Sequence, residues 1–329
     1  MISGCKRLPP TVGVVIVNWN SFFELRHCLA ALAAVRGEFR RVVIIDNCSR
    51  SAPEALDCVR PPNTEYIRLD SNTGFARGNN LALPYLEDCD WIALINPDAY
   101  VDAGWLQAMA EAIPRYSDCA MFASRLIKAN KPELLDGVGD CFHVSGMAWR
   151  HGHGARVADV PIADREVFAP CAAAALYRRD ALLEQGGFDE SYFCYFEDVD
   201  LAFRLRLAGH KCMLVSDAVA YHVGSATTGG QRSDFAVYHG HRNMVWCYVK
   251  NMPALLFWLC LPLHLCANIM AVVRFALRGQ GGSILRAKRD ALRGIPANWV
   301  KRRQVQARRV VSTYDVWRAL EKSVLPRRN

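Results

Sequence analysis

Several common sequence patterns are absent from this chain of 329 residues. Its 13 cysteines form no Cys-x-x-Cys pair and no Cys/His spacing typical of a zinc site. An odd number of scattered cysteines predicts reduced thiols in a reducing compartment rather than a disulfide framework. Residues 1–10 contain no apolar stretch of the kind that a secretory signal requires, so we expect no such signal.

Two nucleotide-binding fingerprints are also missing. The glycine-rich segment 72–80 contains neither the G-x-G-x-x-G pattern of dinucleotide sites nor the lysine of a P-loop. The basic runs 286–289 and 301–303 have no accompanying aromatic platform or known nucleic-acid motif, so we expect no nucleic-acid partner. The segment 151–154 (H-G-H-G) is compatible with metal binding, but its glycines are more typical of a loop.

Positive charge is concentrated at the end of the chain. Residues 274–329 carry 15 Lys/Arg and 3 Asp/Glu, whereas the whole chain has a formal net charge of +8. The net charge of residues 1–273 is therefore −4. Just before this basic tail, residues 252–273 contain no Asp, Glu, Lys or Arg and are long enough to cross a bilayer.

The first hundred residues alternate between apolar runs and helical patterns. Continuous apolar, β-branched runs at 12–17, 41–45, 65–69 and 91–95 are typical of strands buried on both faces. Helical patterns cover 22–35 and the segment that ends at Leu86. Further strands are predicted at 170–177, 211–216 and 219–222, with a helix at 179–185. This alternation predicts an α/β protein with an open, largely parallel sheet.

Polar residues follow each of the four N-terminal strands: Asn18 and Asn20, Asp46 and Asn47, Asn72, and Asp98. Ligands of open α/β sheets bind outside the carboxyl ends of the strands. Turns alone also favour such residues, but four polar ends on one edge predict a single binding site. An Asp behind Asn-Pro, as at 96–98, suits a hard cation that holds a diphosphate, although a β-turn explains the same tripeptide.

The segment 195–200 (Y-F-E-D-V-D) places three carboxylates within four residues. Apolar residues at helical spacing follow it from Leu201 onwards, so Glu197 and Asp198 are expected at the end of a loop or in the first helical turn. The helix dipole favours negative charge there. We therefore expect a lowered pKa and an ionised Asp198 at pH 7.

Taken together, these stretches resemble the inverting glycosyltransferases of family 2, which have an A-type fold, and in particular their bacterial rhamnosyltransferase-like branch. The matching stretches occur in the family's order over residues 11–225, at 17–20 (V-N-W-N), 46–49 (D-N-C-S), 72–80 (N-T-G-F-A-R-G-N-N), 96–98 (N-P-D), 187–190 (G-F-D-E), 196–200 (F-E-D-V-D) and 221–222 (Y-H).

The resemblance implies a role for individual residues. Asp98 matches the metal-binding acid of the D-x-D motif, whose first acid is replaced by Asn96, and His222 matches a position that often completes the metal site. Asp198 matches the general base, with Glu197 as the alternative and Asp200 as a capping or orienting residue. Residues implied to bind the nucleotide-sugar are Asn18, Asn20, Asp46, Asn47, Asn72, Gly74, Phe75, Gly78, Asn79, Asn96 and Asp98.

The implied reaction is a single displacement with inversion. A divalent cation, Mn²⁺ or Mg²⁺, neutralises the nucleoside diphosphate leaving group, and a base removes the proton of the acceptor hydroxyl. The branch suggests dTDP-L-rhamnose as donor, but UDP- and GDP-sugars fit the same motifs. The expected acceptor is a lipid-linked or other glycan of a cell-surface polysaccharide. An alternative is a catalytically inactive nucleotide-sugar-binding or scaffold protein of the same fold.

We expect a catalytic domain at 1–250, with a nucleotide-binding half at 11–98 and an acceptor half at 99–250, followed by a helical basic extension at 251–329. Both the catalytic domain and the basic tail are expected on the cytoplasmic side. Residues 252–273 are therefore predicted to lie in the membrane interface as a peripheral anchor. The alternative is a helix that packs on the catalytic domain. The sequence does not indicate an oligomeric state.

Overall fold

The computed structural model describes residues 10–50, 56, 59–161, 163–224 and 233–323. Residues 1–9, where no secretory signal was expected, lie outside these ranges. Ten strands of the described chain form one sheet, in the order β10-β12-β6-β11-β4-β1-β2-β3 with β5 beside β12 and β7 beside β6. Their bounds are β1 Val12–Asn18, β2 Arg41–Asp46, β3 Thr64–Arg68, β4 Trp91–Ile95, β5 Ala99–Val101, β6 Cys119–Lys128, β7 Lys131–Gly137, β10 Arg165–Val167, β11 Ala174–Arg178 and β12 Lys211–His222.

The predicted open, mostly parallel sheet is confirmed. Strands β4, β1, β2 and β3 are parallel neighbours, and β12 is parallel to β6. Strand β11 is antiparallel to both β4 and β6 and joins the two parallel groups. The carboxyl ends of β1, β2 and β4 consequently meet at one edge of the sheet, at Asn18, Asp46 and Ile95.

Strand β1 shows why an unbroken apolar run forms a central strand. All seven of its residues are buried. Val15 and Val17 belong to the apolar core on one face of the sheet, and Val12, Val14 and Ile16 belong to the core on the other face. Because successive side chains of a strand point to opposite faces, only a continuously apolar sequence can fill both cores.

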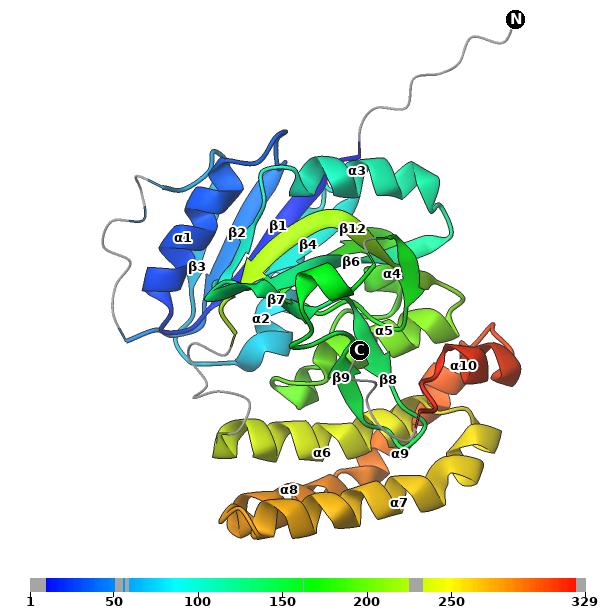
Figure 1. Cartoon of the computed structure of the whole chain (residues 1–329). Helices are drawn as coiled ribbons and strands as arrows, with labels where there is room; N and C mark the ends of the chain where they lie inside the picture. The colour runs from blue at the N-terminus through cyan, green and yellow to red at the C-terminus, as the bar shows by residue number, and fades with distance from the viewer. Residues whose placement is uncertain (1–9, 51–55, 57–58, 162, 225–232, 324–329) are drawn as a thin grey trace, which may run out of the picture.

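Helices cover both faces of the sheet and form a separate layer beneath its polar edge (Figure 1). Three short 3₁₀ turns, η1 Leu83–Leu86, η2 Val157–Asp159 and η3 Glu190–Tyr192, accompany them. The α-helices are α1 Phe22–Ala33, α2 Gly74–Ala82, α3 Trp105–Arg115, α4 Arg179–Glu184, α5 Glu197–Leu207, α6 Asp234–Asn251, α7 Ala254–Ala276, α8 Gly281–Arg293, α9 Ile295–Ala307 and α10 Thr313–Ala319.

One prediction about the strands was wrong. The sequence predicted separate strands at 211–216 and 219–222, but the structure has the single strand β12, with an irregularity in its register between Val215 and Val219. The sequence interpretation ended the first strand at Ser216 and began the next at Val219. The strand continues because β6 pairs with both halves.

A hairpin of β8 Asp140–Phe142 and β9 Ala148–Arg150 lies between the sheet and the helix layer (Figure 1). His264 of α7 contacts the turn of this hairpin, with its Nδ1 2.7 Å from the carbonyl oxygen of Ser145. Helix α6 packs against α8 and α9. The structure thus places α6, which precedes the predicted boundary at residue 250, in the same layer as the C-terminal helices. The division at 250 stays a prediction.

Candidate functional site

A cavity of about 720 Å³ opens at the carboxyl ends of the central strands. Nine of the predicted site residues line it: Asn47, Asn72, Gly74, Phe75, Asn96, Asp98, Glu197, Asp198 and His222. The remaining five, Asn18, Asn20, Asp46, Gly78 and Asn79, are not among its lining residues. Residues 170–173, which were predicted to begin a strand, precede β11 and contribute Cys171, Ala172 and Ala173 to the wall.

Four of the five residues that do not line the cavity form hydrogen bonds with their neighbours. Asp46 is fully buried and accepts hydrogen bonds from Asn18 Nδ2 (3.2 Å) and from the hydroxyl of Ser49. The backbone N–H of Asn20 donates to the same hydroxyl at 2.8 Å. Asn79 Nδ2 donates to the carbonyl oxygen of Phe75 (2.9 Å). Direct contacts of these residues with a nucleotide stay predictions.

Asn47 and Gly74 tie the end of β2 to the start of α2. Asn47 Nδ2 donates to the carbonyl oxygen of Gly74 (3.0 Å), and its Oδ1 accepts from the N–H of Thr73 (2.7 Å). Gly74 has φ +84°, and a Cβ there would lie 2.6 Å from the carbonyl oxygen of Phe193. Only glycine avoids both the strain and the collision. This close approach brings the Phe193 loop against the start of α2.

The two predicted metal ligands lie close together. Nε2 of His222 is 3.4 Å from Oδ1 of Asp98, and both side chains are buried. Ligand atoms in neighbouring octahedral positions, at about 2.1 Å from a cation, are about 3 Å apart, so the pair fits one divalent ion after a small adjustment. Asn96 also lines the cavity, and its buried Oδ1 has no hydrogen-bond partner among the described residues.

His222 has a second carboxylate neighbour, Asp136 of β7, whose Oδ2 lies 2.7 Å from Nδ1. Burial lowers the pKa of His222, but its hydrogen bonds with Asp136 and Asp98 outweigh this effect and the net shift is upward. For Asp136, burial raises the pKa, whereas hydrogen bonds from His153 and His222 and the charge of Arg150 hold it well below its ordinary value. Asp136 is therefore ionised.

Glu197 and Asp198 begin helix α5, as predicted. Asp198 Oδ2 accepts a hydrogen bond from the N–H of Ala172 (3.2 Å), and Oδ1 accepts from the N–H of Val199 (2.8 Å). The expected lowering of the Asp198 pKa was wrong. Burial raises its pKa by more than these hydrogen bonds and Arg150 lower it. Burial and the charge of Asp198 also raise the pKa of Glu197.

The loop before α5 is strained. Phe193, Tyr195 and Phe196 have φ of 67°, 64° and 70°, values that non-glycine residues rarely adopt. Asp200, on the first turn of α5, does not line the cavity. Its carboxylate is buried against Arg204 (2.9 Å) and Lys250 (2.7 Å), which fits the predicted orienting role.

A cluster that the sequence did not reveal lies beside the predicted base. One ligand-type atom each of Asp140, Cys171 and Asp198 lies within 4.8 Å of the others. Burial and the nearby charge of Asp198 raise the pKa of Asp140 to about 7. Two carboxyl groups in one buried site favour sharing a proton over double ionisation. We therefore interpret Asp140 as the carboxyl group that holds the proton when Asp198, the predicted base, is ionised.

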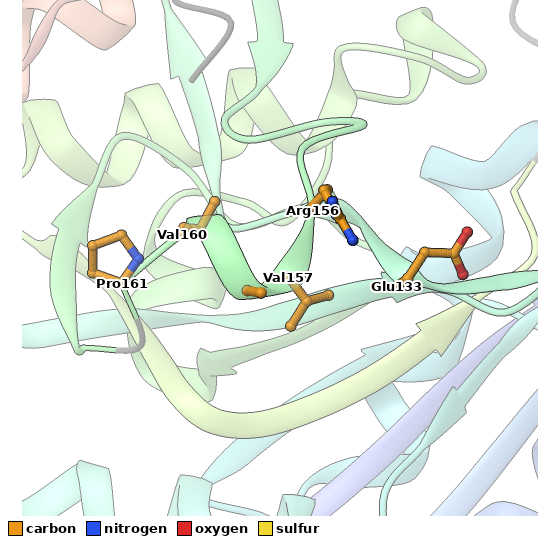
Figure 2. A pocket seen from close by; sticks show the side chains of 6 residues that line it. Glu133, Arg156, Val157, Val160 and Pro161 are labelled. Atoms are coloured by element: carbon orange, nitrogen blue, oxygen red, sulfur yellow. The ribbon is translucent and has the colours of Figure 1, made fainter.

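A second hollow, of about 540 Å³, lies along β7 and η2. Figure 2 shows Val157, Val160 and Pro161 on its wall, with Glu133 and Arg156 at one end. None of these residues was predicted to bind a ligand. The lining has one acidic and one basic side chain, Glu133 and Arg156, and is otherwise apolar. The hollow therefore lacks the group of carboxylates that lines the larger cavity.

Comparison with known proteins shows the family to which this chain belongs. Residues 13–185, more than half of the chain, match the model of the family described as Glycosyl transferase family 2. The chain belongs to glycosyltransferase family 2. It is therefore a glycosyltransferase, and the matched residues include the strand ends and the predicted metal residue Asp98.

Two curated relatives of this family 2 chain come from Mycobacterium tuberculosis. The chain is 26% identical over 249 residues to N-acetylglucosaminyl-diphospho-decaprenol L-rhamnosyltransferase. The aligned region covers 69% of this chain and 80% of that protein. It is also 26% identical over 293 residues to pre-mycofactocin glycosyltransferase, covering 85% of this chain and 58% of that protein. The predicted resemblance to rhamnosyltransferases is confirmed at the level of the family.

Solved structures confirm the A-type fold. Residues 1–349 of TarS from S. aureus, in complex with UDP-GlcNAc, superpose with a TM-score of 0.58 at 18% identity and cover 90% of both chains. GalNAc-T7 with UDP, GalNAc and Mn²⁺ superposes with a TM-score of 0.55 at 13% identity, over 74% of this chain and 48% of that one. At these identities, the two structures show a shared fold and say nothing about the substrates of this chain.

Proposed function

We propose that this chain is an inverting glycosyltransferase that moves a sugar from a nucleotide-sugar to a hydroxyl group of a lipid-linked acceptor or another glycan at the cytoplasmic face of the plasma membrane. The observation that carries the proposal is that Asp98, His222 and Asp198 line one cavity. In this proposal Asp98 and His222 would bind a cation, and Asp198 would be the base. The rhamnosyltransferase relative makes dTDP-L-rhamnose the first donor to test.

The residues at the strand ends would hold the donor. Asp98 and His222 would bind Mn²⁺ or Mg²⁺, with Asn96 as an additional oxygen ligand, because hard cations prefer oxygen ligands and also accept imidazole nitrogen. When bound, the cation offsets the charge that develops on the diphosphate as it leaves. Asn47, Asn72 and the Gly74 loop would position the nucleotide half of the donor.

The chemical step would rest on Asp198. Its carboxylate would accept the proton of the acceptor hydroxyl while the hydroxyl oxygen attacks the anomeric carbon and the bond to the diphosphate breaks. A base on the face opposite the leaving group gives inversion in one displacement. Backbone N–H groups of Ala172 and Val199 fix the carboxylate. Glu197 stays the alternative base.

The helix layer would bring the enzyme to its acceptor. Helix α7 is long and apolar enough to cross a membrane. One of its faces packs on the protein through Leu256, Phe257, Cys260 and His264. Its other face leaves large apolar side chains exposed, namely Leu255, Trp258, Leu259, Leu263, Leu265, Ile269, Met270 and Val273. A helix with one docked and one exposed apolar face fits a position in the membrane interface better than a crossing.

Release of nucleoside diphosphate tests the proposal. Purified full-length protein would be given dTDP-L-rhamnose, UDP-sugars or GDP-sugars with a polyprenyl-diphosphate-linked sugar, in Mn²⁺, Mg²⁺ or EDTA. The expected result is acceptor-dependent release with one donor, lost in EDTA, with an inverted anomeric centre in the product by NMR. Donor binding without release for every donor and acceptor would favour the inactive scaffold instead.

A further inference from the structure

A carboxylate that the sequence analysis did not single out lies behind the predicted metal ligand His222. Asp136 is the penultimate residue of β7 and is buried. Strand β7 pairs with β6, and β6 pairs with β12, which ends in His222. The sheet itself therefore sets Asp136 Oδ2 at 2.7 Å from His222 Nδ1.

The contact fixes which ring nitrogen of His222 carries a proton. Arg150 Nη1 donates a hydrogen bond to the same Oδ2, so Asp136 is an ionised acceptor. A carboxylate cannot donate, and hence Nδ1 of His222 must carry the hydrogen of the 2.7 Å contact. The other nitrogen, Nε2, lies 3.4 Å from Asp98 Oδ1. A cation can only be bound by a ring nitrogen that has no proton.

We propose that Asp136 is a positioning residue that holds His222 in the Nδ1–H tautomer and directs Nε2 toward Asp98 and the cation. The inference rests on the metal-dependent part of the proposed function. It deepens that function because it assigns the residue that prepares the metal ligand rather than another ligand. Losing the hydrogen-bond acceptor of a metal-binding histidine typically weakens metal binding by about 10- to 100-fold.

The neighbours of Asp136 hold it in place but cannot replace it. Arg150 Nη1 is 3.4 Å from His222 Nδ1, but an arginine only donates and so cannot accept the Nδ1 proton. His153 Nδ1 lies 2.8 Å from the backbone oxygen of Asp136 and 3.4 Å from Oδ1. Arg150 ends β9 and His153 lies in the segment after it. The hairpin therefore holds the Asp136 carboxylate, which in turn positions His222.

Two substitutions separate hydrogen bonding from charge. Asp136→Asn and Asp136→Leu both remove the negative charge beside Arg150, but only asparagine keeps an oxygen where the two donors meet. Asp164→Asn is the matched control, since Asp164 accepts from Ser216 and Tyr116 and does not line the cavity. Mn²⁺ binding would be measured by electron paramagnetic resonance without donor, and the His222 tautomer by ¹⁵N NMR, with assignment from His222→Asn.

The expected results differ between the two variants. At a pH where the His222 ring is neutral, wild type and Asp136→Asn should show the Nδ1–H tautomer and bind Mn²⁺ within a few-fold of each other, as should Asp164→Asn. Asp136→Leu should weaken Mn²⁺ binding by about 10- to 100-fold and lose the preference for Nδ1–H. Equal behaviour of Asp136→Asn and Asp136→Leu, whether both are normal or both are weak, overturns the inference.

Two further outcomes are decisive. If wild type binds no Mn²⁺ while it still binds nucleotide, the metal-dependent function fails, and the NMR result decides the Asp136 contact alone: an unchanged tautomer in Asp136→Leu overturns it. If Asp136→Leu does not fold, as judged by circular dichroism, the double variant Asp136→Leu, Arg150→Met takes its place. That variant removes the buried guanidinium together with its partner.

Discussion

Asn243 of α6 contacts the strained loop before α5, and its side-chain Nδ2 is 2.7 Å from the backbone carbonyl oxygen of Tyr195. The same nitrogen is 3.0 Å from the carbonyl of Tyr192 and 2.9 Å from that of Cys194. One buried amide thus holds the segment whose left-handed residues lead into Glu197 and Asp198. Asn243 thus connects the helix layer, which includes the exposed apolar face of α7, to the loop that precedes the proposed base Asp198.

Replacing Asn243 by leucine should lower kcat by about 10², because a base displaced by about 1 Å loses its reactive geometry. The three carbonyl groups would also lose their buried donor, and the free energy of unfolding should fall by about 1–3 kcal/mol. Asn298→Leu is the control. Asn298 is also a buried asparagine of the helix layer, but among the described residues its side chain donates only to the carbonyl of Gly294, the residue that precedes α9. Equal kcat losses in both variants would contradict a role specific to Asn243.

Most of the sheet was predictable because its strands have to be apolar on both sides. Asn18, Asp46 and Asp98 could be placed at one edge since parallel strands share a direction. The single strand β12 could not be recognised, because its continuity depends on pairing with β6 rather than on its own residues. The same holds for the strained loop before α5, whose conformation is held by contacts from α6.

Asp198→Asn should leave donor affinity within a few-fold and lower kcat by at least about 10², the usual scale for losing a general base. Since burial raises the pKa of Asp198, the base form is lost at a higher pH than for an ordinary aspartate near 3.9. The rate of wild type should fall as the pH drops through this raised value. Normal turnover in the variant would move the base to Glu197 or elsewhere.

The neighbouring Asp140 offers a second measurement on the same pair of carboxyl groups. Burial and the charge of Asp198 raise the pKa of Asp140 to about 7, so Asp140 is protonated over the acid limb that Asp198 sets. Asp140→Asn should therefore leave that limb in place and remove a step near pH 7 from the pH–rate profile, whereas Asp164→Asn should keep both. A step near pH 7 that persists in Asp140→Asn would show that another group causes it.

Asp98→Ala should abolish the part of donor affinity that depends on the metal, because a diphosphate facing the sheet needs its charge offset. Calorimetric titration with the donor nucleotide would be performed in Mn²⁺ and in EDTA. The wild-type protein should bind more tightly in Mn²⁺, and the variant should bind equally in both. An affinity of wild type that EDTA leaves unchanged would count against the cation site.

The sequence missed Asp136, Asp140 and Asn243, all of which contact or approach the predicted residues. Asp136 and Asp140 lie on short strands whose partners are fixed by the sheet and the hairpin, and Asn243 lies in a helix with no motif. An available signal was the H-G-H-G segment, interpreted as a loop, since His153 contacts Asp136. Such residues reach the site from elements that are far apart in the sequence, so no short sequence motif indicates them.

Asp189→Asn should lower the free energy of unfolding at pH 7 by about 3 kcal/mol, because it removes the partner of two lysines. Asp189 Oδ2 lies 2.7 Å from Lys250 Nζ, and Oδ1 lies 2.6 Å from Lys301 Nζ of α9. Lys250 would keep Asp200 as a partner, which limits the loss. Thermal and urea unfolding would measure the change, and Asp164→Asn provides a comparison outside this network.

The stabilisation by Asp189 also has a pH dependence of known sign. Burial raises its pKa, but Lys250 and Lys301 outweigh burial and lower it overall. A carboxyl group with a lowered pKa in the folded state stabilises the protein above about pH 4 and loses this effect as the pH falls below its ordinary value. Wild type should therefore lose stability faster than Asp189→Asn on acidification from about pH 4. Parallel curves would show that the ion pairs contribute nothing.

The last prediction concerns the membrane. Full-length protein should bind vesicles that contain anionic lipid through the exposed face of α7, because burial of Trp258, Leu259 and Ile269 adds to the attraction of the nearby arginines, each worth about 1 kcal/mol at an anionic surface. High salt should weaken the binding without abolishing it, since only the electrostatic part is screened.

A triple variant, Trp258→Ser, Leu259→Ser and Ile269→Ser, should lose flotation with vesicles while soluble-acceptor turnover stays normal. Matched serine substitutions at Val310 and Tyr314, which are exposed outside α7, should leave flotation unchanged. Flotation of the triple variant equal to that of wild type would contradict the interfacial role of α7, because the substituted side chains are those that an interfacial helix has to bury.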